Sequence, residues 1–206
     1  MKTIAIVGIG ALGTRTSSLL AKEKCNLLLF DGDMIEEKNL QRQELFTKRD
    51  IGKSKAIQAK KILKNKNIKA YDCFITEKTV SLLKCDLILD CTDNLKTRFI
   101  INEHAVKNNI PWIYTSLSET TGCIFTIVPG KTPCFYCIFK EKEIEEYCIE
   151  INPKLADKIA EIQVQEAEIF LKKQPYTKEL RYYTLEKNLN IKVKKDQKCS
   201  ICEVNK

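Results

Sequence analysis

Long hydrophobic runs are missing from this chain of 206 residues. No apolar stretch approaches the roughly 20 residues that a membrane-spanning helix needs, so we expect no membrane segment. The opening residues, Met1–Gly8, are too short for the hydrophobic part of a signal peptide, and they lead directly into a glycine motif. We therefore expect a cytoplasmic protein whose first residues form a core strand.

Histidine and arginine are also scarce. The one histidine, His104, lies in a predicted helix, and no Cys–His catalytic pair can be inferred from it. Five arginines accompany 30 lysines, and the net charge is +8. Such a charge can favour an acidic partner, but scattered lysines are also ordinary usage. Because basic residues and aromatics do not alternate near the cysteine pairs, we do not expect a nucleic-acid partner.

The composition otherwise suits one soluble globular domain. Hydrophobic residues make up 44% of the chain and charged residues 30%, and there is no internal repeat or low-complexity linker. A chain of this length can bury a sizeable core but leaves little room for a second domain. We predict a single domain over residues 1–206.

Strand and helix patterns alternate along the chain, which is typical of a parallel sheet covered by helices. Strands are expected at Thr3–Val7, Asn26–Asp31, Ile68–Ile75, Asp86–Asp90, Trp112–Ser116 and Cys123–Val128. Helices are expected at Ala11–Lys24, Asn39–Phe46, Lys53–Asn65, Leu95–Asn108 and Pro153–Lys173. Arg181–Lys194 alternates like a short hairpin. These elements predict an α/β, Rossmann-like doubly wound fold, mostly parallel, with antiparallel strands near the C-terminus.

A glycine motif separates the first strand from the first helix. Gly8, Gly10 and Gly13 form a G-x-G-x-x-G pattern, in which backbone N–H groups and the helix N-terminus can hold phosphate. Asp31 ends the next strand, where a carboxylate can accept hydrogen bonds from ribose hydroxyls. The pattern predicts a nucleotide site but does not separate a dinucleotide from ATP. Glycines that serve only helix–strand packing are the alternative, and Asp33 could be a turn residue.

Polar and basic residues follow that strand. Asn39, Arg42 and Lys55 lie on segments that leave the carboxyl edge of the predicted sheet, where doubly wound folds bind ligands. A triphosphate needs its charge neutralised before attack at phosphorus, and these donors could supply that clamp. A solvated basic helix face is the alternative interpretation.

Another core strand ends in the sequence Asp-Cys-Thr-Asp-Asn, residues 90–94. Asp93 is well placed to hold Mg²⁺, a hard cation that prefers carboxylate and phosphate oxygens. Alternatively, Asp93 or Asn94 caps the helix that follows.

Ten cysteines require an explanation, since a disulfide scaffold is unexpected without a secretory signal. Two C-x-x-C pairs could together hold one tetrahedral Zn²⁺, which would attach the C-terminal region to a mid-chain loop: Cys134, Cys137, Cys199 and Cys202. A redox C-x-x-C is the alternative. Five others lie in apolar surroundings and are expected to pack as small hydrophobes: Cys25, Cys73, Cys85, Cys91 and Cys123.

In its glycine loop, Asp31, residues 39–43, Lys55 and residues 90–94, the chain resembles the ThiF/MoeB/HesA proteins, relatives of the ubiquitin-activating enzymes. The resemblance implies an ATP-dependent adenylyltransferase that activates the C-terminal glycine carboxylate of a ubiquitin-like sulfur carrier ending in Gly-Gly. It further implies that Asp31 binds the ribose and that phosphates lie against Asn39, Arg42 and Lys55. Asp93 and Asn94 would serve the metal–nucleotide site, and the cysteine pairs would hold zinc. Residues 1–116 would form a nucleotide-binding half and residues 117–206 a zinc-bearing, carrier-docking half of a homodimer subunit.

Some relatives use a cysteine near the position of Cys148 for covalent chemistry. Here Glu145 and Glu146 precede it, and acidic neighbours raise a thiol pKa, so an incidental cysteine is the alternative. Many relatives also carry an N-terminal arm whose arginine reaches the partner subunit's ATP. With the sequence starting at Met1, we expect that Arg15 substitutes, that another protein supplies the charge, or that catalysis is weak. A nicotinamide-dependent oxidoreductase and a non-catalytic subunit of a heterodimeric activating enzyme remain alternatives.

Overall fold

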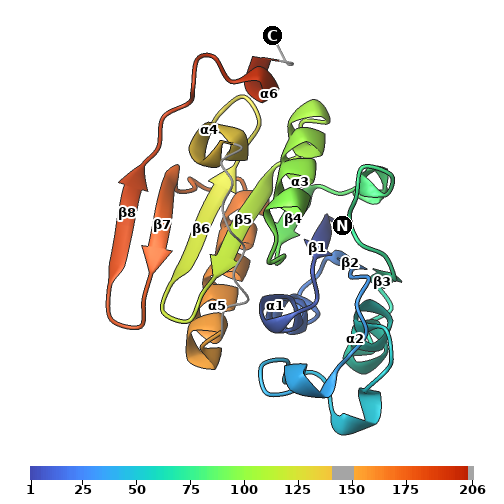
Figure 1. The fold of residues 1–206 in the computed structure, drawn as a ribbon. Helices are drawn as coiled ribbons and strands as arrows, with labels where there is room; N and C mark the ends of the chain where they lie inside the picture. Colours follow the sequence, from blue (N-terminus) through green and yellow to red (C-terminus); the bar gives the residue numbers. More distant parts are fainter. Residues whose placement is uncertain (141–150, 204–206) are drawn as a thin grey trace.

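The computed structural model describes residues 1–140 and 151–203 as helices packed on both faces of one sheet (Figure 1). The strands are β1 (Thr3–Val7), β2 (Asn26–Phe30), β3 (Ile68–Tyr71), β4 (Leu87–Asp90), β5 (Trp112–Leu117), β6 (Gly122–Ile127), β7 (Glu179–Tyr183) and β8 (Asn188–Lys192). The α-helices are α1 (Ala11–Leu20), α2 (Lys55–Leu63), α3 (Leu95–Lys107), α4 (Phe135–Phe139), α5 (Pro153–Leu171) and α6 (Ser200–Glu203). Short 3₁₀ segments cover Glu37–Asn39, Lys48–Asp50 and Val80–Leu82.

The eight strands have the order β3-β2-β1-β4-β5-β6-β7-β8. The first five of these are parallel neighbours, and β6, β7 and β8 add antiparallel strands. The predicted doubly wound sheet with C-terminal antiparallel strands is therefore confirmed. Because the chain leaves β1, β2, β3 and β4 at the same edge, the segments that follow these strands gather there.

Side chains alternate between two cores, as expected for strands buried on both faces. On one face, Ile4 and Ile6 of β1 pack with residues of α1, α2 and α5. On the other face, Ala5 and Val7 of β1 share a core with residues of α3 and α4. Helices α1 and α5 thus pack against each other on the first face, and the glycine loop joins β1 to α1.

The predicted helix at Asn39–Phe46 is wrong. This segment holds the end of a 3₁₀ turn and further turns, with single bonds such as Arg42 N–H to Asn39 O at 3.1 Å. Leu40, Leu45 and Phe46 pack against the α1 face of the sheet from these turns, and their separations in the sequence are not those of one helical face. The short helix α4, which follows Cys134 and ends at Phe139, was not predicted from the sequence.

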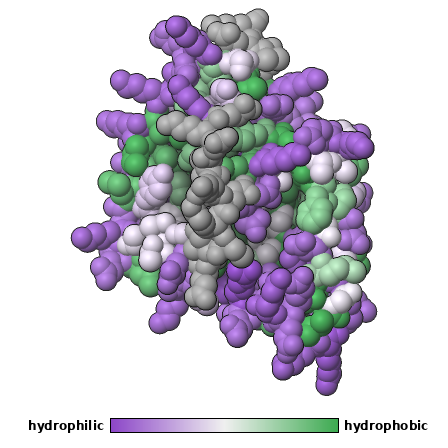
Figure 2. Space-filling model, viewed as in Figure 1, coloured by the Kyte–Doolittle hydropathy of each residue, from purple (hydrophilic) through white to green (hydrophobic). Residues whose placement is uncertain are grey.

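Hydrophilic side chains cover much of the face in Figure 2, with hydrophobic patches between them. This agrees with a chain in which lysine is abundant. Among the described residues, no helix is both long and apolar enough to cross a membrane.

Candidate functional site

The glycine loop is packed tightly at two of its three glycines. Gly8 has a φ of +89°, and a Cβ there would lie 2.7 Å from the carbonyl oxygen of Cys91. A Cβ on Gly13 would lie 1.9 Å from the carbonyl oxygen of Gly8. A Cβ on Gly10 would meet no atom within 4 Å. Two glycines therefore serve packing, and Gly10 faces open space that a ligand could occupy.

Helix α1 begins without a side-chain cap. Gly10 is its N-cap residue, and the first turn carries no acidic side chain. The N–H groups of a helix's first turn have no partner within the helix, and the helix dipole makes this end partly positive. The start of α1 can therefore bind a phosphate group.

Asp31 lies directly beside this loop. One of its carboxylate oxygens accepts a hydrogen bond from the Ile9 N–H at 2.6 Å, and the other accepts one from the Asp33 N–H at 2.8 Å. The residue is only 7% exposed, and burial raises its pKa above the ordinary value while the nearby charge of Lys55 opposes the rise. Each carboxylate oxygen can accept a second hydrogen bond, so Asp31 can still receive a ligand hydroxyl.

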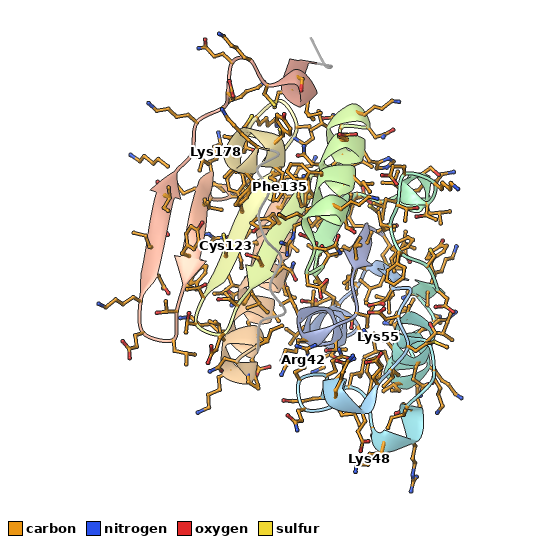
Figure 3. The ribbon with its side chains drawn as sticks, viewed as in Figure 1. Arg42, Lys48, Lys55, Cys123, Phe135 and Lys178 are labelled. Atoms are coloured by element: carbon orange, nitrogen blue, oxygen red, sulfur yellow. The ribbon has the colours of Figure 1, made fainter. Side chains whose placement is uncertain are left out.

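The predicted phosphate-binding side chains already have partners. The ammonium of Lys55 lies 2.7 Å from a carboxylate oxygen of Asp33, and the Arg42 guanidinium donates to Asn39 Oδ1 at 3.3 Å. Figure 3 places Arg42 and Lys55 beside α1. Asp33 is thus more than a turn residue, because it orients Lys55 at this edge of the sheet.

The segment after β4 is fixed by a buried ion pair. Asp90 is fully buried, and its carboxylate accepts from Arg98 Nε at 3.2 Å and from the Thr92 hydroxyl at 2.6 Å. Asn94 caps α3, because its side chain accepts from the Thr97 N–H at 2.9 Å. The capping alternative is therefore confirmed for Asn94, whereas Asp93 is exposed.

Four cysteine sulfurs converge at the end of the sheet opposite the carboxyl ends of the parallel strands. The Sγ atoms of Cys134, Cys137, Cys199 and Cys202 all lie within 4.8 Å of one another and could hold one metal ion. Since β6 runs antiparallel to β5, its end and the following helix α4 reach the edge opposite the glycine loop (Figure 1). This arrangement connects α4 to α6 and lies far from any ligand bound at the start of α1.

The sequence matches the ThiF family model over residues 1–204. The chain belongs to the ThiF family. Its glycine loop, acidic strand end and paired cysteines occur within that match.

This ThiF-family chain is similar to proteins named as adenylyltransferases and activating enzymes. It is 36% identical over 136 residues to the sulfur carrier protein ThiS adenylyltransferase of Bacillus subtilis, covering 62% of this chain and 40% of that protein. It is 34% identical over 133 residues to the Escherichia coli ThiS adenylyltransferase, covering 61% and 53%. Ubiquitin-like modifier-activating enzyme 5 of Drosophila mojavensis is 35% identical over 154 residues, covering 64% and 38%. The chain thus spans about half or less of the length of these relatives.

Solved structures share the fold. Escherichia coli MccB with AMPCPP and MccA has a TM-score of 0.86 at 21% identity, covering 98% of this chain and 66% of that chain. PaaA has a TM-score of 0.75 at 19% identity, covering 94% and 64%. At these identities the likeness shows the fold alone.

One polar residue of this ThiF-family chain was missed by the sequence analysis. Gln163 of α5 is fully buried, and its amide nitrogen donates to the Asp90 carbonyl at 3.0 Å and to the Thr115 hydroxyl at 2.8 Å. Its amide oxygen accepts from the Thr16 hydroxyl at 2.8 Å and from the Cys91 thiol at 3.4 Å. Gln163 of α5 therefore joins α1, β4 and β5. A polar residue at a buried position of a periodic helix was the only available signal.

The sequence also singled out further cysteines and the one histidine. Cys148 lies outside the described residues, and its covalent role stays a prediction. Burial raises the pKa of Cys85 and of Cys123 to about 12, as expected for thiols packed among hydrophobic side chains. Burial lowers the pKa of His104, whose ring nitrogen lies 3.3 Å from the Asn108 amide on the same helix.

Proposed function

We propose that this protein is an ATP-dependent adenylyltransferase that activates the C-terminal glycine carboxylate of a ubiquitin-like sulfur carrier. The observation that carries the proposal is the hydrogen bond from Ile9 N–H to Asp31 at 2.6 Å, which holds the carboxylate of this proposed ribose ligand beside the uncapped start of α1. Membership of the ThiF family and similarity to ThiS adenylyltransferases support it.

In the proposed arrangement, Asp31 accepts hydrogen bonds from the ribose and the α1 N-terminus binds phosphate near Gly10. Arg42 and Lys55, with Asn39, neutralise the triphosphate. The ammonium of Lys55 is paired with the Asp33 carboxylate at 2.7 Å, so it would bind phosphate either in addition to Asp33 or in place of it. Neutralising this charge lowers the barrier to attack by an anion.

The proposed reaction joins a carrier carboxylate oxygen to the α-phosphorus. The bond between that phosphorus and the oxygen bridging to the β-phosphate breaks, pyrophosphate leaves, and a carrier acyl-adenylate remains. Asp93, exposed in the segment between β4 and α3, would hold Mg²⁺, which would supply positive charge to the phosphates. Asn94 would act indirectly, because its side chain fixes the start of α3 beside Asp93.

We further propose that the four-cysteine cluster holds Zn²⁺ in a structural role. Four thiolates about 2.3 Å from one ion at tetrahedral corners lie about 3.8 Å apart. Three Sγ–Sγ distances are 3.8 Å (Cys134–Cys137), 3.6 Å (Cys134–Cys199) and 3.6 Å (Cys137–Cys202). Four protein ligands leave no open position for a substrate, so the site would stabilise the fold.

The proposal includes a homodimer, which size-exclusion chromatography with light scattering would test. The catalytic proposal is tested by incubating the protein with ATP, Mg²⁺ and sulfur carriers ending in Gly-Gly, followed by mass spectrometry for a carrier–AMP adduct. We expect Asp93→Ala to abolish the adduct and Cys148→Ala to leave adenylation intact. An unchanged adduct in Asp93→Ala would contradict the metal assignment, and binding of NAD without ATP–pyrophosphate exchange would favour an oxidoreductase.

A further inference from the structure

Arg15 lies one turn into α1, yet its side chain is only 9% exposed. Its Nη1 atom donates to two backbone carbonyls, to Ala11 O at 2.8 Å and to Arg42 O at 2.7 Å. The first bond stays within α1, and the second reaches the turn that carries the proposed phosphate-binding guanidinium. Arg15 therefore ties the helix of the glycine loop to the backbone of Arg42.

Two carboxylates hold the rest of the Arg15 guanidinium. Its Nε donates to the carboxylate of Asp157, and its Nη2 lies 3.3 Å from Glu44 Oε1. Asp157 lies in the second turn of α5. Most of the five N–H donors are thus in use, and the positive charge is balanced by two acids. Arg15 thus connects α1, the turn that carries Arg42, and α5. Because its guanidinium is occupied by these contacts, it is not free to bind phosphate.

The turn that carries Arg42 needs such a connection. It is not an α-helix, so its backbone lacks the repeated hydrogen bonds that would fix it. Arg42 is held locally through Asn39, by its own N–H at 3.1 Å and its side chain at 3.3 Å. Those bonds stay within the turn, whereas the bond from Arg15 sets the position of the turn relative to α1. A displacement of about 1 Å is enough to weaken a catalytic contact strongly.

We propose that Arg15, anchored by Asp157 of α5, is a positioning residue that sets Arg42 for contact with the nucleotide phosphates. The inference rests on the proposed function, because it assumes that Arg42 binds the triphosphate. Lysine could not replace Arg15, since a single ammonium lacks the planar fork that reaches two carbonyls and two carboxylates together.

A double-mutant cycle tests this inference, with the affinity for Mg·ATP measured by isothermal titration calorimetry on the full chain. The variants are Arg15→Lys, Arg42→Lys and the two combined. Arg49→Lys is the matched control, because it makes the same chemical change at an exposed residue. We expect Arg15→Lys alone to weaken Mg·ATP binding about tenfold, with the melting temperature within about 4 °C of the native value. In the combined variant, Arg15→Lys should add less than about a twofold loss to that of Arg42→Lys.

Three outcomes would overturn the inference: native affinity in Arg15→Lys, native affinity in Arg42→Lys, or losses that multiply in the combined variant, as for two independent phosphate contacts. If the native protein does not bind Mg·ATP, the proposed function itself fails, and the inference fails with it. Should Arg15→Lys not fold, Asp157→Asn removes the distant anchor instead. We then expect about threefold weaker binding, again absent in the Arg42→Lys background; an unchanged affinity would overturn the inference.

Discussion

At the scale of single residues, the glycines of the loop have two different roles. Gly8 and Gly13 allow close packing of the backbone, and Gly10 leaves space for a ligand. Gly13 is in contact with the Gly8 carbonyl, where a methyl group cannot fit, while Gly10 has free space around its missing Cβ. Gly10 also has a φ of −88°, which any residue can adopt. Two chemically identical substitutions should therefore act on different properties, Gly13→Ala on stability and Gly10→Ala on binding.

We expect Gly13→Ala to lower the free energy of unfolding by about 3 kcal/mol, because a buried methyl group would overlap backbone atoms. Gly10→Ala should leave stability within about 0.5 kcal/mol but weaken ATP binding about tenfold, since its methyl group would occupy the phosphate position. Urea unfolding and calorimetric ATP titration of both variants check this. Normal ATP affinity in a folded Gly10→Ala protein would contradict a phosphate site at this loop.

The order of the loop residues made this part of the site predictable from sequence. Gly8, Gly10, Gly13 and Asp31 are fixed by local chain geometry, because a strand, a loop, a helix and a second strand bring them to one edge. The contacts of Arg15 with Asp157 and of Thr16 with Gln163 span 142 and 147 residues of sequence. They depend on how α1 packs against α5, and no pattern within either helix specifies that packing.

At the scale of secondary-structure elements, strands and long helices followed the hydrophobic pattern, and short segments did not. The segment around Arg42 was predicted as a short helix, although Leu40, Leu45 and Phe46 do not have the spacing of one helical face. A turn can bury the same residues with backbone hydrogen bonds between residues three apart, as from Phe46 N–H to Gln43 O. Helix α4 has five residues, too few for a period to be recognised.

Asp50 stabilises the connection between the 3₁₀ turn Lys48–Asp50 and α2. Its carboxylate accepts hydrogen bonds from Lys53, from Thr47 and from the Gln58 amide. The bonds from Lys53 and Thr47 lower the pKa of Asp50 to about 2. A pKa that is lower in the folded state stabilises the protein above the unfolded value of about 4, and this contribution is lost as the pH falls towards the folded value.

The Asp50→Asn variant should therefore be less stable than the native protein at pH 7 and should lose less stability on acidification. We expect the two free energies of unfolding to converge between about pH 4 and pH 2, because the native carboxylate becomes protonated there. Urea unfolding across this range measures the difference. Parallel curves at all pH values would show that Asp50 does not carry this pH dependence.

At the scale of the whole molecule, the sheet places two sites at opposite edges. The proposed nucleotide site lies where β1, β2 and β4 end, and the cysteine cluster lies beyond the end of β6. The spacing of the two C-x-x-C pairs predicted their convergence. The spacing could not predict at which end of the sheet the cluster lies, because that depends on the direction of β6.

We expect Cys199→Ser combined with Cys202→Ser to lose bound zinc, measured by inductively coupled plasma mass spectrometry. The free energy of unfolding should fall by about 3 kcal/mol, because the metal closes a long loop. The affinity for ATP should change less than about threefold, since the other edge of the sheet is untouched. Cys73→Ser, outside the cluster, is the control and should retain the metal. A complete loss of ATP binding in a folded variant would contradict a purely structural role.

The position of Cys199 and Cys202 has a consequence for biosynthesis. The five strands that are parallel neighbours all lie within residues 3–117, so that half of the sheet can assemble while the rest of the chain is still being translated. Two of the four sulfurs emerge from the ribosome only after the β7–β8 hairpin has been made. On the proposed zinc role, the metal can be fully bound only after residues 199–202 have been made, so we expect a cell starved of zinc to accumulate chains whose parallel strands are formed while residues 199–202 are still open to proteases.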